Sequence, residues 1–220
     1  MIVCIDGPAA SGKSTTARLI AEKLDLIYID TGAMYRAAAL CSKQNAIDID
    51  DSQALENMMK NIKIEFRVID QISRIYLNGS DVTEDIRTPD ITMLSSKIAT
   101  IKIVRQKMVE TQRIFAQNNN VILDGRDIGT VVFPNAEFKF FLAATLDERA
   151  LRRHKENLEK GISSDLEQIK RDLAWRDTND TNRAEAPLKK ADDAIEIDTT
   201  EMTVTEQVNK VLKVIKGEIE

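Results

Sequence analysis

Residues 7–14 read Gly7-Pro8-Ala9-Ala10-Ser11-Gly12-Lys13-Ser14, directly after an apolar run and directly before a helical pattern. The two glycines permit backbone conformations in which successive N–H groups surround phosphate oxygens. The N-terminus of the following helix adds further N–H donors and the positive end of its dipole. The stretch therefore predicts a phosphate-binding P-loop, in which Lys13 reaches the outer phosphates and the Ser14 hydroxyl is a ligand of Mg²⁺.

Composition and charge narrow the class of protein. Of the 220 residues, 43% are hydrophobic and 30% charged, which suits one α/β domain with a sizeable core and a small inserted subdomain. The net charge of -5 disfavours nucleic acid and anionic membranes as general partners. The sequence lacks an apolar stretch of the roughly 20 residues that span a bilayer and lacks a signal-peptide pattern, so we expect a cytoplasmic protein. Cys4 and Cys41 are expected to be buried.

Short apolar runs alternate with helix-length segments along the chain. Because such runs are typical of buried parallel strands, the pattern predicts an α/β fold with a three-layer, doubly wound parallel sheet. The predicted strands are Ile2–Ile5, Ile27–Ile29, Val121–Leu123, Phe138–Ala143 and Ala194–Ile197. Ligands of such sheets bind at the carboxyl ends of the strands. At two of these ends, residues 30–36 and 124–130 each contain a carboxylate and an arginine, which we expect near the P-loop.

The middle of the chain has a different pattern. Apolar and polar residues alternate over residues 62–68 and 75–77, before Asn78-Gly79, which is typical of an antiparallel hairpin. We therefore predict an inserted β subdomain at about residues 62–87. Helical material is expected from Ile91 to Ala116, with Asp90 as its N-cap.

The stretch from Asp147 to Asp180 is dense in charged residues. We expect most of these side chains to lie on solvated helix surfaces. Some of the arginines would close over phosphates, and Gly161 would allow two helices to hinge as a lid.

Four motifs together resemble those of the bacterial cytidylate kinases, the CMP/dCMP kinases among the P-loop nucleoside monophosphate kinases. They are the P-loop at 7–14, Asp-Thr-Gly-Ala-Met-Tyr-Arg at 30–36, Asp-Gly-Arg-Asp-Ile-Gly-Thr-Val-Val-Phe-Pro at 124–134, and Asn-Arg-Ala-Glu-Ala-Pro-Leu at 182–188. The resemblance covers nearly the whole chain, including the insert. It implies a single P-loop kinase domain over residues 1–220, with an acceptor-binding insert at about 62–87 and a lid at about 149–165.

The resemblance implies transfer of the γ-phosphoryl group of ATP, with Mg²⁺, to CMP or dCMP, forming ADP and CDP or dCDP. Such a reaction depends on positioning and charge neutralisation more than on covalent catalysis. The implied catalytic residues are Lys13, Arg126, Arg176 and Arg183. The implied ATP-binding residues are Gly7, Pro8, Ala9, Ala10, Ser11, Gly12, Lys13, Ser14 and Thr15.

The same resemblance assigns an acceptor site. A carboxylate can accept from the exocyclic amine of cytosine, and donors can pair with its N3 and O2; Ser96, Arg105 and Asp127 would have these roles. The implied CMP-binding residues are Thr31, Tyr35, Arg36, Ser96, Arg105, Arg126, Asp127, Arg176, Asp180 and Arg183. Ser14 is the expected Mg²⁺ ligand, with Asp124 as a further candidate, and Asp6 is expected to steady the loop.

Other functions stay open at this point. A P-loop kinase for another small acceptor, such as UMP or a metabolite, would not need the insert or the cytosine-reading residues. A non-enzymatic GTPase switch would need Asn-Lys-x-Asp, but the near match at Asn209-Lys210-Val211-Leu212 ends in an apolar residue. A nucleic-acid-dependent ATPase would need a long basic stripe.

We expect a monomer whose partners are small molecules, not nucleic acid or membrane. Two details depart from the usual family pattern, Ala9-Ala10-Ser11 in the P-loop and Thr31 in place of serine.

Overall fold

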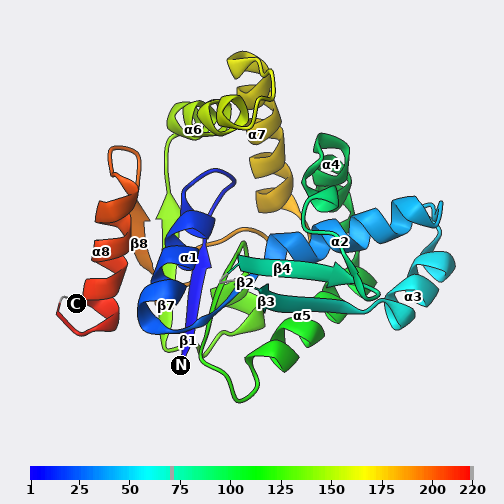
Figure 1. Cartoon of the computed structure of the whole chain (residues 1–220), viewed down its shortest axis with the longest axis horizontal. Helices are drawn as coiled ribbons and strands as arrows, with labels where there is room; N and C mark the ends of the chain where they lie inside the picture. The colour runs from blue at the N-terminus through cyan, green and yellow to red at the C-terminus, as the bar shows by residue number, and fades with distance from the viewer. Residues whose placement is uncertain (70–71, 219–220) are drawn as a thin grey trace. The chain divides into compact units, whose positions relative to one another are not determined.

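The computed structural model describes residues 1–69 and 72–218. The chain divides into two compact units, both drawn in Figure 1. The first unit comprises Met1–Tyr28 and Asn118–Glu220, and the second comprises Ile29–Gln117. The second unit is therefore an insertion in the sequence of the first. Strand β2 (Ile27–Asp30) contains the first boundary between the units, which lies between Tyr28 and Ile29.

The first unit is built on a five-stranded sheet with strand order β2-β6-β1-β7-β8. Strand β1 pairs in parallel with β6 and β7, and β7 pairs in parallel with β8, so the predicted α/β fold with a mostly parallel sheet is confirmed. In the β1–β6 register, Asp6 lies beside Gly125. Besides β2, the strands are β1 (Ile2–Asp6), β6 (Val121–Gly125), β7 (Phe138–Ala143) and β8 (Ile195–Asp198).

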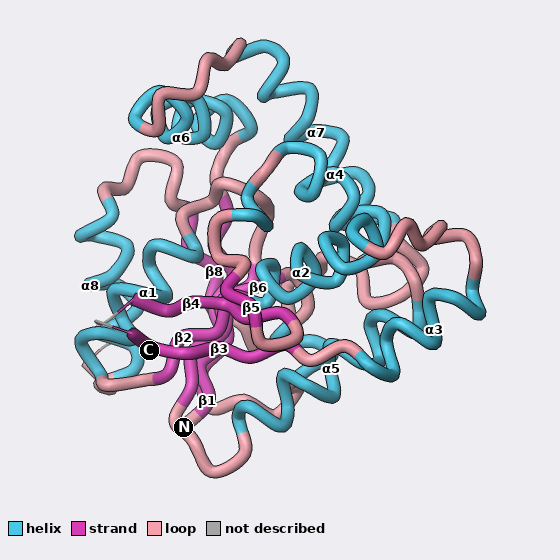
Figure 2. The backbone as a smooth tube through the Cα atoms, turned by 45° about the vertical axis from the view of Figure 1, so that its right-hand side comes forward, coloured by secondary structure: helices cyan, strands magenta, loops and turns pink. Residues whose placement is uncertain are grey.

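Helices flank this sheet. Helix α1 contacts β1, β6 and α8, and the apolar core between them includes Val3, Ile5, Ile20 and Phe140. Helices α6 and α7 pack against each other, and Figure 2 shows the loop that joins them. The helices of this unit are α1 (Lys13–Leu24), η2, a short π-helix (Ile128–Val132), α6 (Leu146–Glu159), α7 (Leu166–Asn182) and α8 (Val204–Ile215).

The second unit contains a separate antiparallel sheet of order β3-β4-β5, which confirms the hairpin pattern in the sequence. Helix α2 packs on α4, and α3 packs on α5, around buried residues that include Met34, Leu55 and Met108. The elements are α2 (Thr31–Gln44), α3 (Ser52–Asn61), β3 (Ile64–Ile69), β4 (Ile72–Leu77), β5 (Ser80–Asp81), the 3-10 helix η1 (Asp85–Arg87), α4 (Pro89–Ile98) and α5 (Lys102–Ala116).

The helix predicted from Ile91 to Ala116 is two helices, α4 and α5, separated at residues 99–101. The prediction of Asp90 as its N-cap is also wrong. Thr88 is the N-cap residue, because Pro89 has a φ suited to the first helical position, and Asp90 instead pairs with Lys43. Among the described residues, no helix has both the length and the apolar character needed to cross a membrane.

Candidate active site

The P-loop connects β1 to α1, as the sequence predicts. Gly7 has φ 150° and Gly12 has φ 92°, values that favour glycine. A Cβ on Gly7 would lie 2.2 Å from the carbonyl oxygen of Leu142, so this position has no room for a side chain. The Ser11 hydroxyl is buried in the same loop without a hydrogen-bond partner among the described residues. A loop with a buried, unpaired hydroxyl fits a ligand rich in acceptor oxygens.

Lys13 is the buried cation of this loop, and its Nζ donates to the carbonyl oxygen of Pro8 at 2.9 Å. Burial and the positive charges of Arg126 and Arg176 together lower the pKa of Lys13 to about 7, although the negative charge of Asp124 acts in the opposite direction. Three cations therefore lie close enough to repel one another electrostatically. A polyphosphate would relieve this repulsion and restore the charge of the ammonium group.

The Ser14 hydroxyl lies against a carboxylate at the end of β6. Its Oγ donates to Asp124 Oδ2 at 2.6 Å, and Tyr28 donates its hydroxyl to Asp124 Oδ1 at 2.8 Å. A hydroxyl and a carboxylate in contact are the oxygen ligands that Mg²⁺ prefers. Among the described residues, there is no group of three or more His, Cys, Asp or Glu side chains that could hold a metal. Mg²⁺ usually keeps water and phosphate ligands instead of such a cage, so the pair fits this ion.

Arginines and aspartates form a network that joins the residues directly after β6 to α7 and its C-cap. Arg126 donates through Nε to Asp180 Oδ2 at 2.7 Å, and Arg183 donates to Asp127 Oδ1 at 3.3 Å. Although burial acts to raise it, the pKa of Asp180 is held below its usual value by the charge and hydrogen bond of Arg126. Arg176 also lies in α7 and acts on both Lys13 and Asp180 electrostatically. Among the predicted residues of the first unit, Arg126, Arg176 and Asp180 thus act on Lys13, and Arg183 joins Asp127 to the same network through Asp180.

The remaining predicted acceptor residues lie in the second unit. Arg36 pairs with Asp30 at 3.0 Å, and its buried Nε has no hydrogen-bond partner among the described residues. The guanidinium of Arg105 lies 5.7 Å from the centre of the Tyr35 ring and donates to the carbonyl oxygen of Ala99 at 3.2 Å. The structure therefore pairs Tyr35 with Arg105, as suits two residues of one site.

Two further predicted residues of this unit are buried on helices. Ser96 donates its hydroxyl to the carbonyl oxygen of Thr92 at 3.4 Å within α4. Thr31 begins α2, directly after Asp30, whose carboxylate accepts from the amide of Ala33 at 2.8 Å. The Ser96 hydroxyl is thus held by the backbone of its own helix.

Sequence reasoning missed Arg149, which it placed among solvated charges. Arg149 is only 5% exposed, and its guanidinium donates to the P-loop carbonyl oxygen of Ala9 at 3.2 Å and to Asp177 at 2.6 Å. The missed signal is the spacing of Leu146 and Ala150, which face the apolar cluster that includes Ala9. Arg149 lies on that same helix face.

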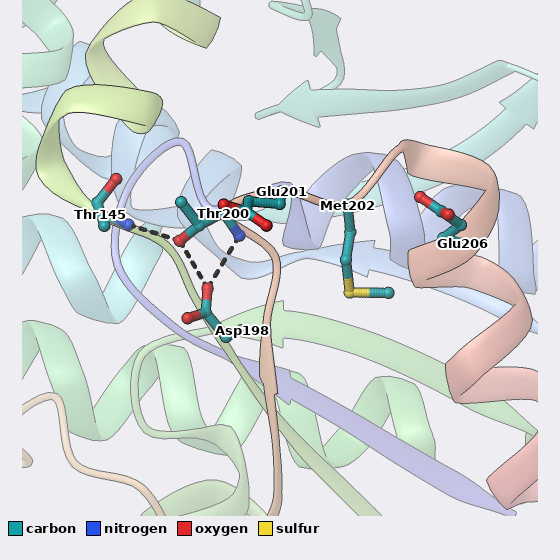
Figure 3. A pocket seen from close by; sticks show the side chains of 6 residues that line it. All are labelled: Thr145, Asp198, Thr200, Glu201, Met202 and Glu206. Carbon is teal, nitrogen blue, oxygen red and sulfur yellow. Dashed lines mark hydrogen bonds between the residues drawn. The ribbon is translucent and has the colours of Figure 1, made fainter.

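A pocket of about 550 Å³ lies beside the loop after β8, and Figure 3 shows its lining. Thr200 donates to Asp198 at 2.6 Å and accepts from the Thr145 amide at 3.1 Å across one side of it. The preceding residue, Thr199, donates to the P-loop carbonyl oxygen of Ser11 at 3.0 Å. The pocket is lined by Thr145, Asp198, Thr200, Glu201, Met202 and Glu206.

Comparison with known proteins decides the family. The family model described as cytidylate kinase matches residues 3–217. The chain belongs to the cytidylate kinase family. A relative named cytidylate kinase from Bacillus cereus (strain ATCC 10987 / NRS 248) is 47% identical over 215 residues, which cover 98% of this chain and 96% of the relative. The same figures apply to the cytidylate kinase of Bacillus thuringiensis (strain Al Hakam).

A solved structure shares the fold of this family member at low identity. It is an uncharacterized protein from Eubacterium ventriosum ATCC 27560, with a TM-score of 0.55 and 13% identity. The match covers 99% of this chain and 98% of the other. The likeness concerns the fold alone. The resemblance to bacterial cytidylate kinases noted from the four motifs is thereby confirmed at the level of the family.

Proposed function

We propose that this protein transfers the γ-phosphoryl group of ATP to CMP or dCMP, giving ADP and CDP or dCDP. The observation that carries the proposal is the network of Arg126, Asp180, Asp127 and Arg183, of which Arg126 and Asp180 act on Lys13. A P-loop alone is compatible with many nucleotide-binding proteins. Paired arginines and carboxylates beside it supply both cations for two approaching phosphates and acceptors for a nucleoside.

On the donor side, the backbone N–H groups of residues 7–15 would hold the ATP phosphates. Lys13 would lie against the transferring group, where its charge stabilises the charge that develops on the phosphoryl oxygens. The adenosine would occupy the pocket beside Thr200, since the Thr199–Ser11 hydrogen bond joins that loop to the P-loop. This pocket adds a donor-side surface that the motifs did not identify.

Ser14 and Asp124 would hold Mg²⁺. When bound, the ion neutralises phosphate charge and fixes the orientation of the polyphosphate. Tyr28 would orient the Asp124 carboxylate through its hydroxyl.

On the acceptor side, Arg36, Arg126 and Arg183 would hold the phosphate of CMP. The buried Nε of Arg36 is a donor suited to a phosphate oxygen. Because a phosphate monoester is largely ionised near pH 7, the attacking oxygen needs no general base. Arg176 would place a further positive charge beside the transferring phosphoryl group.

The cytosine base would be read by Ser96, Arg105 and Asp127. The Asp127 carboxylate would accept from the exocyclic amine, and the other two would donate to the ring acceptors. Tyr35 and Thr31 would line this site, while Asp180 would accept from a sugar hydroxyl. UMP, which presents a carbonyl in place of the amine, would leave Asp127 facing an acceptor and would bind less well.

Residues of about 149–165 would act as a lid and those of about 62–87 as part of the acceptor site, within one kinase domain. The left-handed φ of 70° at Gly161, between α6 and α7, supports a hinge at that point. We also propose that the protein works as a cytoplasmic monomer on small molecules, without nucleic acid or membrane.

Titration calorimetry with CMP, dCMP and UMP tests the acceptor assignment directly. CMP or dCMP binding at least about tenfold tighter than UMP is the expected result, since one buried carboxylate would lose its donor. Equal affinities for CMP and UMP would contradict the proposed role of Asp127.

A further inference from the structure

Asp6 is a buried carboxylate that directly precedes the P-loop. It is 4% exposed, and both of its oxygens are occupied: Oδ1 accepts from the Ile128 amide at 2.9 Å and Oδ2 from the Gly129 amide at 2.8 Å. The sequence suggested that Asp6 steadies the P-loop. Its two hydrogen bonds instead go to the first residues of η2, directly after Arg126 and Asp127.

Arg126 and Asp127 lie between β6 and η2 and belong to neither element. Asp127 has φ -145° and ψ 22°, between the end of β6 and the start of η2. On one side, β6 is fixed by its pairing with β1, which places Gly125 beside Asp6. On the other side, the Asp6 carboxylate fixes Ile128 and Gly129. The backbone of the two residues between these anchors, Arg126 and Asp127, is thereby held on its C-terminal side by the Asp6 carboxylate, while their side chains pair with Asp180 and Arg183.

Gly129, whose amide donates to Asp6, is closely packed against Lys139. A Cβ on Gly129 would lie 3.2 Å from Lys139 Cδ, a tight contact, and 3.4 Å from Asp6 Oδ2, an ordinary contact distance. Lys139 is itself buried and donates to both oxygens of Asp193, at 2.9 and 2.7 Å. The Lys139 charge is thus paired with Asp193 and not with Asp6. Besides burial, the charge of Asp127 raises the pKa of Asp6, and the charge of Arg126 lowers it.

The amides of Ile128 and Gly129 explain why a carboxylate suits position 6. At this side-chain length, only aspartate offers two acceptor oxygens, whereas asparagine has one acceptor and would turn an amide N–H₂ toward the other N–H. A buried donor without a partner costs more than the hydrogen bond is worth on average, so the backbone would shift to avoid it. Such a shift would move Asp127 and Arg126 before it moved the P-loop.

We propose that Asp6 is a positioning residue for the acceptor nucleotide, acting through the backbone of Ile128 and Gly129 on Arg126 and Asp127. The inference rests on the proposed function, because it takes Arg126 and Asp127 as acceptor-binding residues. Lys13 Nζ donates to Pro8 and Ser14 Oγ donates to Asp124, so neither of these hydrogen bonds uses Asp6 as its acceptor. We therefore expect replacement of Asp6 to affect CMP binding more than ATP binding.

The test is steady-state kinetics of Asp6→Asn, with KM measured separately for CMP and ATP. We expect KM for CMP to rise about tenfold, as the loss of one buried hydrogen bond predicts, with KM for ATP within twofold of wild type. Asp192→Asn makes the same charge change at an exposed position and should leave both values unchanged. An equal rise in both KM values, or a rise for ATP alone, would overturn the proposal.

A second variant tests the role of Asp6 if Asp6→Asn does not fold. Gly129→Ala places a methyl group 3.2 Å from Lys139 Cδ and 3.4 Å from Asp6 Oδ2, so it should shift the backbone that Asp6 binds and raise KM for CMP a few-fold, with KM for ATP unchanged. An unchanged KM for CMP, or a rise shared with ATP, would count against the role of Asp6. Failure of the wild-type protein to phosphorylate CMP would refute the proposed function itself, which is a distinct result.

Discussion

Ser14 Oγ and Asp124 Oδ2 lie 2.6 Å apart, so the first turn of α1 is joined to the end of β6 across 110 positions of sequence. Both groups are oxygen ligands of the kind that Mg²⁺ binds, and both lie beside Lys13. Replacement of either group should therefore act on the metal dependence of turnover.

Asp124→Asn should lower kcat at least about a hundredfold and raise the Mg²⁺ concentration needed for half-maximal rate, because it removes a charge that neutralises the ion. Tyr28→Phe is the matched control, since it removes only the hydroxyl that donates to Asp124. Its effect should be a few-fold. The measurement is initial rate against Mg²⁺ concentration, and identical Mg²⁺ curves for wild type and Asp124→Asn would exclude Asp124 as a ligand.

Asp127→Ala should reduce discrimination between CMP and UMP. The ratio of kcat/KM for the two acceptors should fall by about one to two orders of magnitude, because the carboxylate that accepts from the cytosine amine is gone. KM for ATP should stay within twofold. If KM for ATP rose and the CMP to UMP ratio held, Asp127 would belong to the donor site.

Arg149→Ala should destabilise the fold by about 3 kcal/mol, since it removes charge-assisted hydrogen bonds of a buried guanidinium to Ala9 and Asp177. KM for ATP should also rise, because the Ala9 carbonyl belongs to the P-loop. Arg153→Ala, which removes an ion pair with Glu156 at the surface, should cost less than about 1 kcal/mol. Urea denaturation of both variants measures the difference, and equal midpoints would refute a structural role for Arg149.

The ionisation of Asp6 should make stability depend on pH. Burial raises the pKa of Asp6 from 3.8 to about 7, so between these values the folded protein holds a proton that the unfolded chain has lost. The contribution of Asp6 to the free energy of unfolding is then complete below pH 4 and falls as pH rises toward 7, by at most about 1.4 kcal/mol per pH unit.

Asp6→Asn removes this ionisation and should flatten the pH dependence in that window. The comparison is urea denaturation of wild type and variant at pH 5 and pH 8. The difference between the free energies of unfolding of the two proteins removes the contribution of the carboxylates that both of them have. A wild-type stability that falls no more steeply than that of the variant would show that Asp6 ionises normally.

Local patterns in the sequence predicted the parts of the molecule that depend on neighbouring residues. The strands, the P-loop and the antiparallel hairpin each have a short-range signal, and each was found close to the predicted bounds. The resemblance to the family added residues outside the motifs such as Asp180, whose ion pair with Arg126 spans 54 positions and has no local signal.

The parts that sequence reasoning missed depend on tertiary packing. Arg149 looks like its charged neighbours in sequence, and only the packing of α6 on the P-loop segment buries it. The partners of Asp6 lie 122 and 123 positions away, so the sequence could not show which loop it holds. Helices α4 and α5 are separated although no proline or glycine lies between Ile98 and Lys102, so the sequence contains no local signal for this break.

The central claim is that this protein phosphorylates CMP or dCMP from ATP. The most direct test couples ADP production to a spectrophotometric signal, with ATP and Mg²⁺ against CMP, dCMP, UMP, AMP, GMP and shikimate, and with Lys13→Met as the inactive control. The account predicts strong turnover with CMP and dCMP, weak turnover with the others, and loss of at least about a hundredfold in the variant. Preferred turnover of another acceptor, or wild-type rates from Lys13→Met, would contradict it.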